Sequence, residues 1–170
     1  MRNIILFLFL IHSILIISQD NFRIKSITYG IGTYKISNRS SVFVAHSSFD
    51  LTTIYNSNLF TLSNNVGFGF GKNEKSNTDL EGFYEFDFLY GREFELSDRF
   101  RLETHAGLGF ISQNNSTDSD EKQSLAFPIK LKILYYFGKR FAIGLNPNVS
   151  FNKVNAIYSL NFVFHKTFRL

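Results

Sequence analysis

The most regular feature of the chain is a two-residue alternation over residues 80–96, LEGFYEFDFLYGREFEL. One parity is apolar and largely aromatic, whereas the other carries acidic residues such as Glu85 and Asp87. Because successive side chains of a strand point to opposite faces, this segment is predicted to be a β-strand with one apolar and one acidic face. It is longer than most strands of globular proteins. A lipid bilayer around a polar-filled barrel is an environment that suits such a strand.

The same alternation recurs after residue 19 and predicts eight strands in all. They are expected at 24–36, 43–55, 59–71, 80–96, 100–112, 124–137, 140–151 and 156–169. The connections alternate between two kinds. Tight, turn-forming joints lie at 56–58, 97–99 and 138–140, and longer polar stretches lie at 37–41, 72–79, 113–123 and 152–155. Short turns at one end and longer loops at the other are typical of outer-membrane barrels, with the loops at the cell surface.

The predicted fold class is therefore all-β, an eight-stranded antiparallel up-and-down transmembrane β-barrel. In hydrocarbon every backbone N–H and C=O must be paired, so the sheet must close on itself. A barrel of this size is filled by side chains and has no open pore. Glycines gather on the polar parity, where they would relieve crowding inside a narrow barrel. They are Gly30, Gly32, Gly67, Gly69, Gly71, Gly107 and Gly109.

The first 18 residues are predicted to be a secretory signal peptide. Arg2 precedes an apolar run that His12 interrupts and that ends at Ser18, the expected cleavage site lying near Ser18–Gln19. The run is short of the roughly 20 apolar residues that a spanning helix needs. An uncleaved membrane anchor is the alternative. Residues 19–170 are predicted to form one outer-membrane β-barrel domain.

Composition narrows the possible functions. The chain contains 21 Phe and 8 Tyr, and its mean hydropathy of −0.04 argues against a bundle of membrane helices. The absence of Cys excludes disulfides and thiolate metal sites. The formal charge of +4 is scattered along the chain, so nucleic acid is not a predicted partner.

The pattern resembles the small eight-stranded outer-membrane barrels of Gram-negative bacteria, of the OmpX and OmpA-transmembrane-domain type. The C-terminal parity of Phe162, Phe164, Phe168 and Leu170 matches the aromatic last strand of that group, although Lys166 interrupts it and the last residue is Leu rather than Phe. The resemblance implies location in the cell outer membrane. It also implies two partners, outer-membrane lipid and the barrel-assembly machinery that recognises the C-terminal strand. It implies no activity.

The inner polar face carries charges of both signs on neighbouring strands. The predicted interior charge network consists of Glu81, Glu85, Asp87, Arg101, Glu103, His105, Lys130 and Lys132. A buried charge without a partner is costly, so these residues are expected to form ion pairs that fill the barrel. A polar path for ions or protons is the alternative, which the narrow interior disfavours.

No catalytic, cofactor-binding or metal-binding residues are predicted. A membrane-embedded lipid A-modifying hydrolase is an alternative, because His46, Ser48 and Asp50 share one face. Residues two apart on a strand lie roughly 6.5–7 Å apart, however, farther than a nucleophile and its base. The acidic residues of 113–123 lack the Gly of a calcium loop, so this stretch is expected to be a solvated surface loop.

A secreted, lipocalin-like ligand-binding barrel is the other alternative, with the aromatic face turned inward. That face is too bulky for a small ligand cavity, and the chain has no Trp. The chain is therefore predicted to be a porin-like barrel of the cell envelope that is not an enzyme. Its expected role is structural, or it presents surface loops to an unknown partner.

Overall fold

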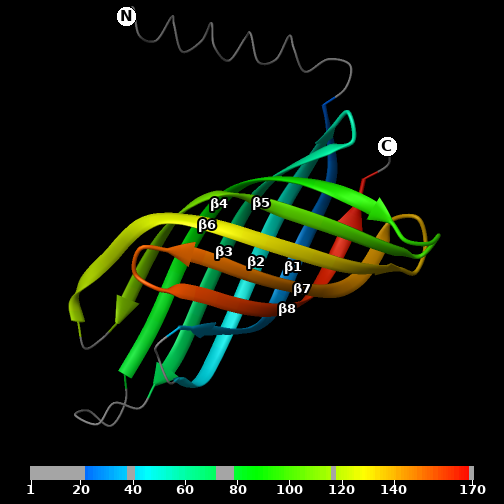
Figure 1. Cartoon of the computed structure of the whole chain (residues 1–170). Helices are drawn as coiled ribbons and strands as arrows, with labels where there is room; N and C mark the ends of the chain where they lie inside the picture. Colours follow the sequence, from blue (N-terminus) through cyan, green and yellow to red (C-terminus); the bar gives the residue numbers. More distant parts are fainter. Residues whose placement is uncertain (1–21, 38–40, 72–78, 116–117, 169–170) are drawn as a thin grey trace, which may run out of the picture.

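The fold is a closed barrel of eight antiparallel strands, in which each strand pairs with the next and β1 pairs with β8 (Figure 1). The computed structural model describes residues 22–37, 41–71, 79–115 and 118–168. The strands are β1 (Arg23–Ile36), β2 (Ser41–Tyr55), β3 (Asn58–Gly71), β4 (Asp79–Glu95), β5 (Phe100–Asn115), β6 (Asp118–Tyr136), β7 (Phe141–Asn152) and β8 (Ala156–Thr167). The predicted fold class is confirmed. The predicted signal peptide lies outside the described residues.

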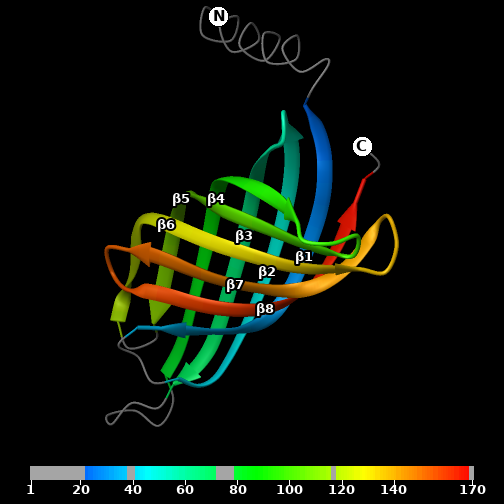
Figure 2. The same cartoon turned by 45° about the vertical axis from the view of Figure 1, so that its right-hand side comes forward.

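The two ends of the barrel differ in their connections. The tight turns β2–β3, β4–β5 and β6–β7 lie at the end where β1 begins and β8 finishes, which we call the turn end (Figures 1 and 2). The other connections lie at the opposite end, the loop end. At the turn between β2 and β3, Asn56 and Ser57 have φ angles of 46° and 67°. Two successive positive φ values fit the turn type whose twist matches an antiparallel hairpin.

The two faces of the sheet separate as the alternation predicts. Phe88 is 54% exposed on the outer wall, whereas the adjacent Asp87 is fully buried inside. Phe, Tyr, Leu, Ile and Val side chains are exposed around the whole outside, and polar side chains fill the inside. An exposed apolar wall on this scale suits lipid rather than water. It does not fit the lipocalin-like alternative, which requires the aromatic face inside.

Glycines admit large side chains into the narrow interior. A Cβ atom on Gly67 would overlap the ring of Phe83, which lies directly opposite on β4. A Cβ atom on Gly109 would likewise overlap the carboxylate of Asp87. Glycine at these two positions therefore provides space that any other residue would occupy.

The polar stretch 113–123 is not the loop that the sequence predicted. β5 continues to Asn115 and β6 begins at Asp118, with Ser112 opposite Gln123. Backbone pairing across a hairpin does not require apolar side chains, so polarity alone was a poor guide to where the strands end.

On the side away from β5, the pairing of β6 with β7 ends at Ala126, which lies opposite Asn152. This protruding hairpin, residues 111–115 and 118–125, extends beyond the β7–β8 connection (Figures 1 and 2). No helix in the described part of the chain is long and apolar enough to cross a membrane.

Candidate functional site

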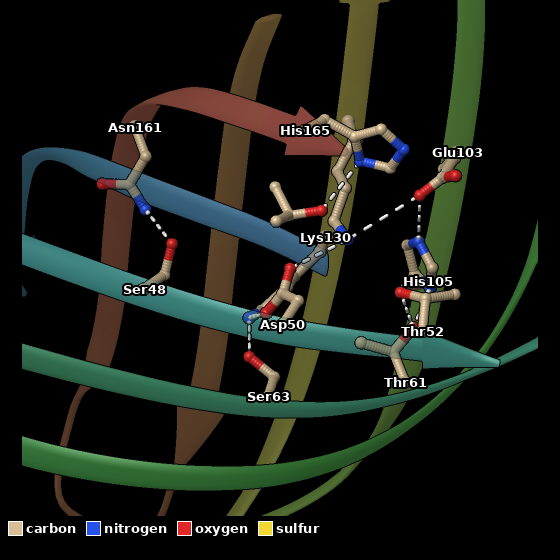
Figure 3. Close-up of polar contacts among 12 residues, drawn as sticks. Ser48, Asp50, Thr52, Thr61, Ser63, Glu103, His105, Lys130, Asn161 and His165 are labelled. Atoms are coloured by element: carbon tan, nitrogen blue, oxygen red, sulfur yellow. Dashed lines mark hydrogen bonds and ion pairs between the residues drawn. The ribbon is translucent and has the colours of Figure 1, made fainter. Parts of the chain in front are cut away.

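Asp50 is the centre of the charged interior. Its Oδ1 atom lies 3.3 Å from Lys130 Nζ, and its Oδ2 atom lies 2.9 Å from Lys132 Nζ. All three side chains are fully buried. Lys130 also donates hydrogen bonds to Ser63 and, at 3.1 Å, to Asn65 Oδ1. Figure 3 shows Asp50, Ser63 and Lys130 converging from β2, β3 and β6.

Ion pairs extend from this centre in both directions. On one side, Lys130 Nζ lies 3.8 Å from Asp87 Oδ2. On the other, Lys132 Nζ lies 3.7 Å from Glu103 Oε2, and Glu103 also accepts from Lys25.

Lys25 in turn contacts Glu93, which lies 3.3 Å from Arg101 Nη1. Arg101 Nη2 lies 3.2 Å from Glu95 Oε1 at the turn end. Acids and bases thus alternate through the barrel, in an assembly that we call the ion-pair chain. It comprises Asp87, Lys130, Asp50, Lys132, Glu103, Lys25, Glu93, Arg101 and Glu95.

The eight residues predicted from the sequence do not all enter this chain. Asp87, Lys130, Lys132, Glu103 and Arg101 do, although the Arg101 side chain is 28% exposed. His105 is attached to the chain, because its Nε2 atom lies 3.3 Å from Glu103 Oε2.

Among the described residues, the two remaining carboxylates form no ion pair within the ion-pair chain. Glu85 lies beside Asp87 and accepts a hydrogen bond from Ser150. Glu81 lies nearer the loop end, 3.5 Å from the Tyr34 hydroxyl. Both carboxylates are buried.

Lys25 is a member of the chain that the alternation pattern places on the wrong face. Alternation from Tyr29 and Ile27 would place residue 25 on the lipid side. The pairing between β1 and β2 instead shifts between Ile24 and Ser26, so Lys25 is an extra residue in the strand. Such a β-bulge breaks the alternation, and Lys25 and Ser26 are both fully buried. A Lys on the same parity as Ile27 and Tyr29 does not indicate a bulge by itself, because Lys35 shares that parity and is exposed.

Asp50, Glu93 and Glu95 also lie in the chain but not in the predicted network. The alternation places all three on the polar face, but it does not identify their partners. Which buried acid contacts which base depends on barrel curvature and on distances across the interior. The sequence does not carry that information directly.

The residues of the hydrolase alternative are not arranged for catalysis. His46 Nδ1 lies 2.8 Å from Asn161 Oδ1, and Asn161 Nδ2 donates to Ser48 Oγ at 3.2 Å. Asn161 therefore lies between the candidate base and the candidate nucleophile, as Figure 3 shows for Asn161 and Ser48. His46 and Ser48 are buried, and Asp50 is occupied by two lysines.

No metal centre is evident in the described part of the chain, where no group of three or more His, Asp and Glu residues could hold an ion. The side chains of Asp118, Asp120 and Glu121, which the sequence analysis compared with a calcium loop, lie outside the described residues.

Towards the loop end the interior changes from charged to apolar. Buried Tyr34, Ile36, Phe83, Ile111, Ala126 and Ile157 form one cluster, which we call the apolar layer. The rings of Tyr34 and Phe83 meet edge to face, 5.0 Å apart. The layer lies between the loop end and the ion-pair chain. A second buried cluster lies towards the turn end, where Arg101 packs over the Tyr136 ring. It comprises Leu134, Tyr136, Ala142 and Val163.

A closed eight-stranded barrel with a polar-filled interior and an apolar outer wall defines the chain as an outer-membrane β-barrel protein. Its family is also shown. The chain belongs to the family described as Domain of unknown function (DUF2715), whose profile matches residues 23–169. None of the curated proteins compared with the chain is significantly similar to it.

Solved structures with the same fold are small outer-membrane barrels. Neisserial surface protein A (NspA) has a TM-score of 0.67 at 10% identity, over 88% of this chain and 100% of that one. Ail, the attachment invasion locus protein of Yersinia pestis, has a TM-score of 0.58 at 12% identity, over 88% and 100%. The N-terminal β-barrel domain of Pseudomonas aeruginosa OprF has a TM-score of 0.55 at 13% identity, over 86% and 99%. At these identities the likeness establishes the fold alone.

Proposed function

We propose that the protein is a sealed outer-membrane anchor that presents its protruding hairpin to a surface partner. The observation that carries this proposal is the hairpin of β5 and β6, which extends beyond Ala126, the last residue of β6 in this direction that pairs with β7. An exposed edge offers backbone N–H and C=O groups to an extended segment of another chain, which can add to the sheet as a further strand.

The interior supports an anchor rather than a channel. The apolar layer, the ion-pair chain, the second buried cluster and buried Ser, Thr and Asn side chains fill the barrel along its length. A barrel of eight strands has room for side chains but not for a water-filled pore. His46 and Ser48 are buried within the same filling, which supports a role other than catalysis.

The sequence of the β6 strand of this hairpin indicates the kind of partner. Residues 118–125 read DSDEKQSL, with three acidic residues and one Lys. Like charges oppose pairing between two copies of this edge, and they favour an extended segment that carries Lys or Arg. A structure of Ail is known in complex with the heparin analogue sucrose octasulfate. Sucrose octasulfate is an anion, whereas the acidic hairpin of the present chain favours a basic partner.

The orientation of the barrel in the outer membrane is part of the same proposal. Residues 1–18 act as a cleaved signal, the turn end faces the periplasm, and the loop end faces the exterior. The barrel-assembly machinery recognises the C-terminal strand. The charge network serves as structural filling that holds the barrel in one closed form.

Orientation can be tested by cysteine labelling, because the natural chain contains no Cys. We expect Gln123→Cys, in the protruding hairpin, to react with a membrane-impermeant maleimide on intact cells. Asn56→Cys, in the β2–β3 turn, is the matched control and is expected to react only after the outer membrane is permeabilised. Labelling of Asn56→Cys alone on intact cells would reverse the proposed orientation.

Strand addition can be tested with the refolded barrel in nanodiscs and a library of extended peptides of graded charge. The natural chain is expected to enrich basic peptides of high β-propensity. A variant in which residues 114–121 are replaced by Asn-Gly shortens the hairpin and is expected to lose this enrichment. A variant with Asp118→Asn, Asp120→Asn and Glu121→Gln keeps the edge and is expected to lose only the charge preference. Equal enrichment by the shortened variant would refute the proposal, provided that heat-modifiable gel migration shows it to be folded.

A further inference from the structure

A groove of about 530 Å³ crosses the outer wall over β4, β5 and β6. Its floor is built from two cross-strand rows that have a small residue in the middle. Tyr90, Ala106 and Ile129 form one row, and Arg92, Thr104 and Leu131 form the next. Large side chains on either side of small ones leave a depression that follows β5. The volume is in the range of pockets that hold small molecules.

One cation lies at the mouth of this groove. Arg92 is exposed on the outer wall and lines the groove together with Phe94 and Leu131. No described residue forms an ion pair or a hydrogen bond with its guanidinium group. Lys130 is the other Lys or Arg among the described residues that line this groove, and its side chain is buried inside the barrel. Arg92 is therefore a charge on the lipid side whose countercharge is not supplied by the described protein.

The depth of Arg92 in the membrane follows from the register. Arg92 lies opposite Asn58, the residue directly after the Asn56–Ser57 turn. The hydroxyl of the neighbouring Tyr90 donates to Asn58 Oδ1 at 2.7 Å. Tyrosine hydroxyls and arginine heads gather where the bilayer meets water. Arg92 is thus at the level of lipid headgroups at the turn end, and the groove extends from it into the hydrocarbon.

We propose that this groove is a phospholipid site. The phosphate of a lipid headgroup pairs with the guanidinium of Arg92, which can donate two parallel hydrogen bonds to phosphate oxygens. One acyl chain of the same lipid lies over Thr104 and Ala106, between Tyr90 and Ile129. The two parts reinforce each other, because the charge fixes the headgroup at the mouth and the groove fixes the direction of the chain. The site is separate from the protruding hairpin and does not depend on the surface-interaction role.

The test uses the full mature barrel, extracted mildly after reconstitution with phosphatidylglycerol, and native mass spectrometry to count retained lipids. Arg92→Gln is expected to lower retention roughly fivefold, since a basic side chain near an anionic lipid surface contributes roughly 1 kcal/mol. Ala106→Leu fills the groove without changing charge and is expected to lower retention as well. Both substitutions lie on the outer wall, so the barrel interior is unchanged.

Lys166→Gln is the matched control. Lys166 is also an exposed cation near the turn end, but it lies over the rings of Phe141 and Phe168 and lines no part of this groove. It is expected to leave lipid retention unchanged. Equal loss with Lys166→Gln would show a general interfacial charge effect, and wild-type retention in Arg92→Gln and Ala106→Leu would show bulk lipid contact only. Either result would overturn the site. Repeating the measurement with phosphatidylethanolamine separates recognition of the shared phosphate, which predicts retention of both lipids, from a net-charge preference for phosphatidylglycerol.

Discussion

The two halves of the barrel interior are filled in opposite ways, although the same strands build both. Around Asp50, Lys130 and Lys132 the filling is a chain of buried charges, with the smaller cluster of Leu134, Tyr136, Ala142 and Val163 beyond it at the turn end. Towards the loop end, Tyr34, Phe83 and their neighbours form an apolar layer. A buried charge is tolerable only while its partner is present, because the cost of its desolvation remains when the partner is removed. Truncating a side chain in an apolar layer lowers the free energy of unfolding by an amount that increases with the number of buried apolar atoms removed and the cavity left behind. The charged half should therefore respond to single substitutions more steeply than the apolar half.

The largest effect is expected from Asp50→Ala. It removes the carboxylate that contacts both Lys130 and Lys132. The carboxylates that remain in ion-pair contact are farther away, Asp87 at 3.8 Å from Lys130 and Glu103 at 3.7 Å from Lys132. Breaking a buried ion pair from one side costs about 3–5 kcal/mol, and we expect a value near the upper limit. Urea unfolding of the barrel in lipid vesicles, followed by gel migration, measures the loss. A cost below about 2 kcal/mol would show that the centre of the ion-pair chain is not essential.

Phe83→Ala tests the apolar half. The ring of Phe83 is 5% exposed and stacks 5.6 Å from His46. Its removal is expected to cost about 3 kcal/mol through lost contacts and an internal cavity. The same unfolding assay applies, with Phe86→Ala on the lipid wall as the matched control. If Phe83→Ala destabilised the barrel more than Asp50→Ala, the contrast between the two halves would be wrong.

Gly67→Ala adds an atom where Gly67 faces the ring of Phe83. Overpacking of this kind is expected to cost about 1–3 kcal/mol. The double variant with Phe83→Leu should recover part of this loss, because the ring that the added methyl group overlaps is absent. A double-mutant cycle in the unfolding assay measures the recovery. Strictly additive costs would contradict the close approach of these two residues.

The smallest effect is expected from Glu95→Gln at the exposed end of the ion-pair chain. Glu95 is 69% exposed where it contacts Arg101, so water screens the pair. Exposed ion pairs contribute less than about 1 kcal/mol. Unfolding at low and high salt is expected to give nearly the same midpoint for this variant as for the natural chain. A loss comparable with that of Asp50→Ala would mean that the chain acts as one unit up to its exposed end.

The sequence predicted the strands and their faces because a period of two is a direct consequence of strand geometry. It failed where that geometry is interrupted. The bulge at Lys25 turns a lipid-side position inward, and only backbone pairing with β2 reveals it. It also failed at the hairpin tip, because the polar residues of 113–123 are compatible with a strand in water as well as with a loop.

Part of the ion-pair chain could be predicted from the sequence for the same reason. The polar parity of β4, β5 and β6 supplied Asp87, Glu103, Lys130 and Lys132, all of which are members of the ion-pair chain. Their partners Asp50 and Lys25 come from β2 and β1, across the barrel. Adjacent strands can be compared by register, but contacts across the interior depend on barrel diameter and tilt. Those quantities are set by the closed sheet as a whole.

The position of Lys25 has a consequence for how the barrel assembles. Lys25 is on β1, while Glu93 and Glu103 are on β4 and β5, on strands that are not its neighbours. In the closed barrel β1 pairs with β8, and Lys25 reaches both carboxylates across the interior. These ion pairs join the first strand to the middle of the sheet, so they stabilise the closed barrel relative to one that is open at the β1–β8 seam.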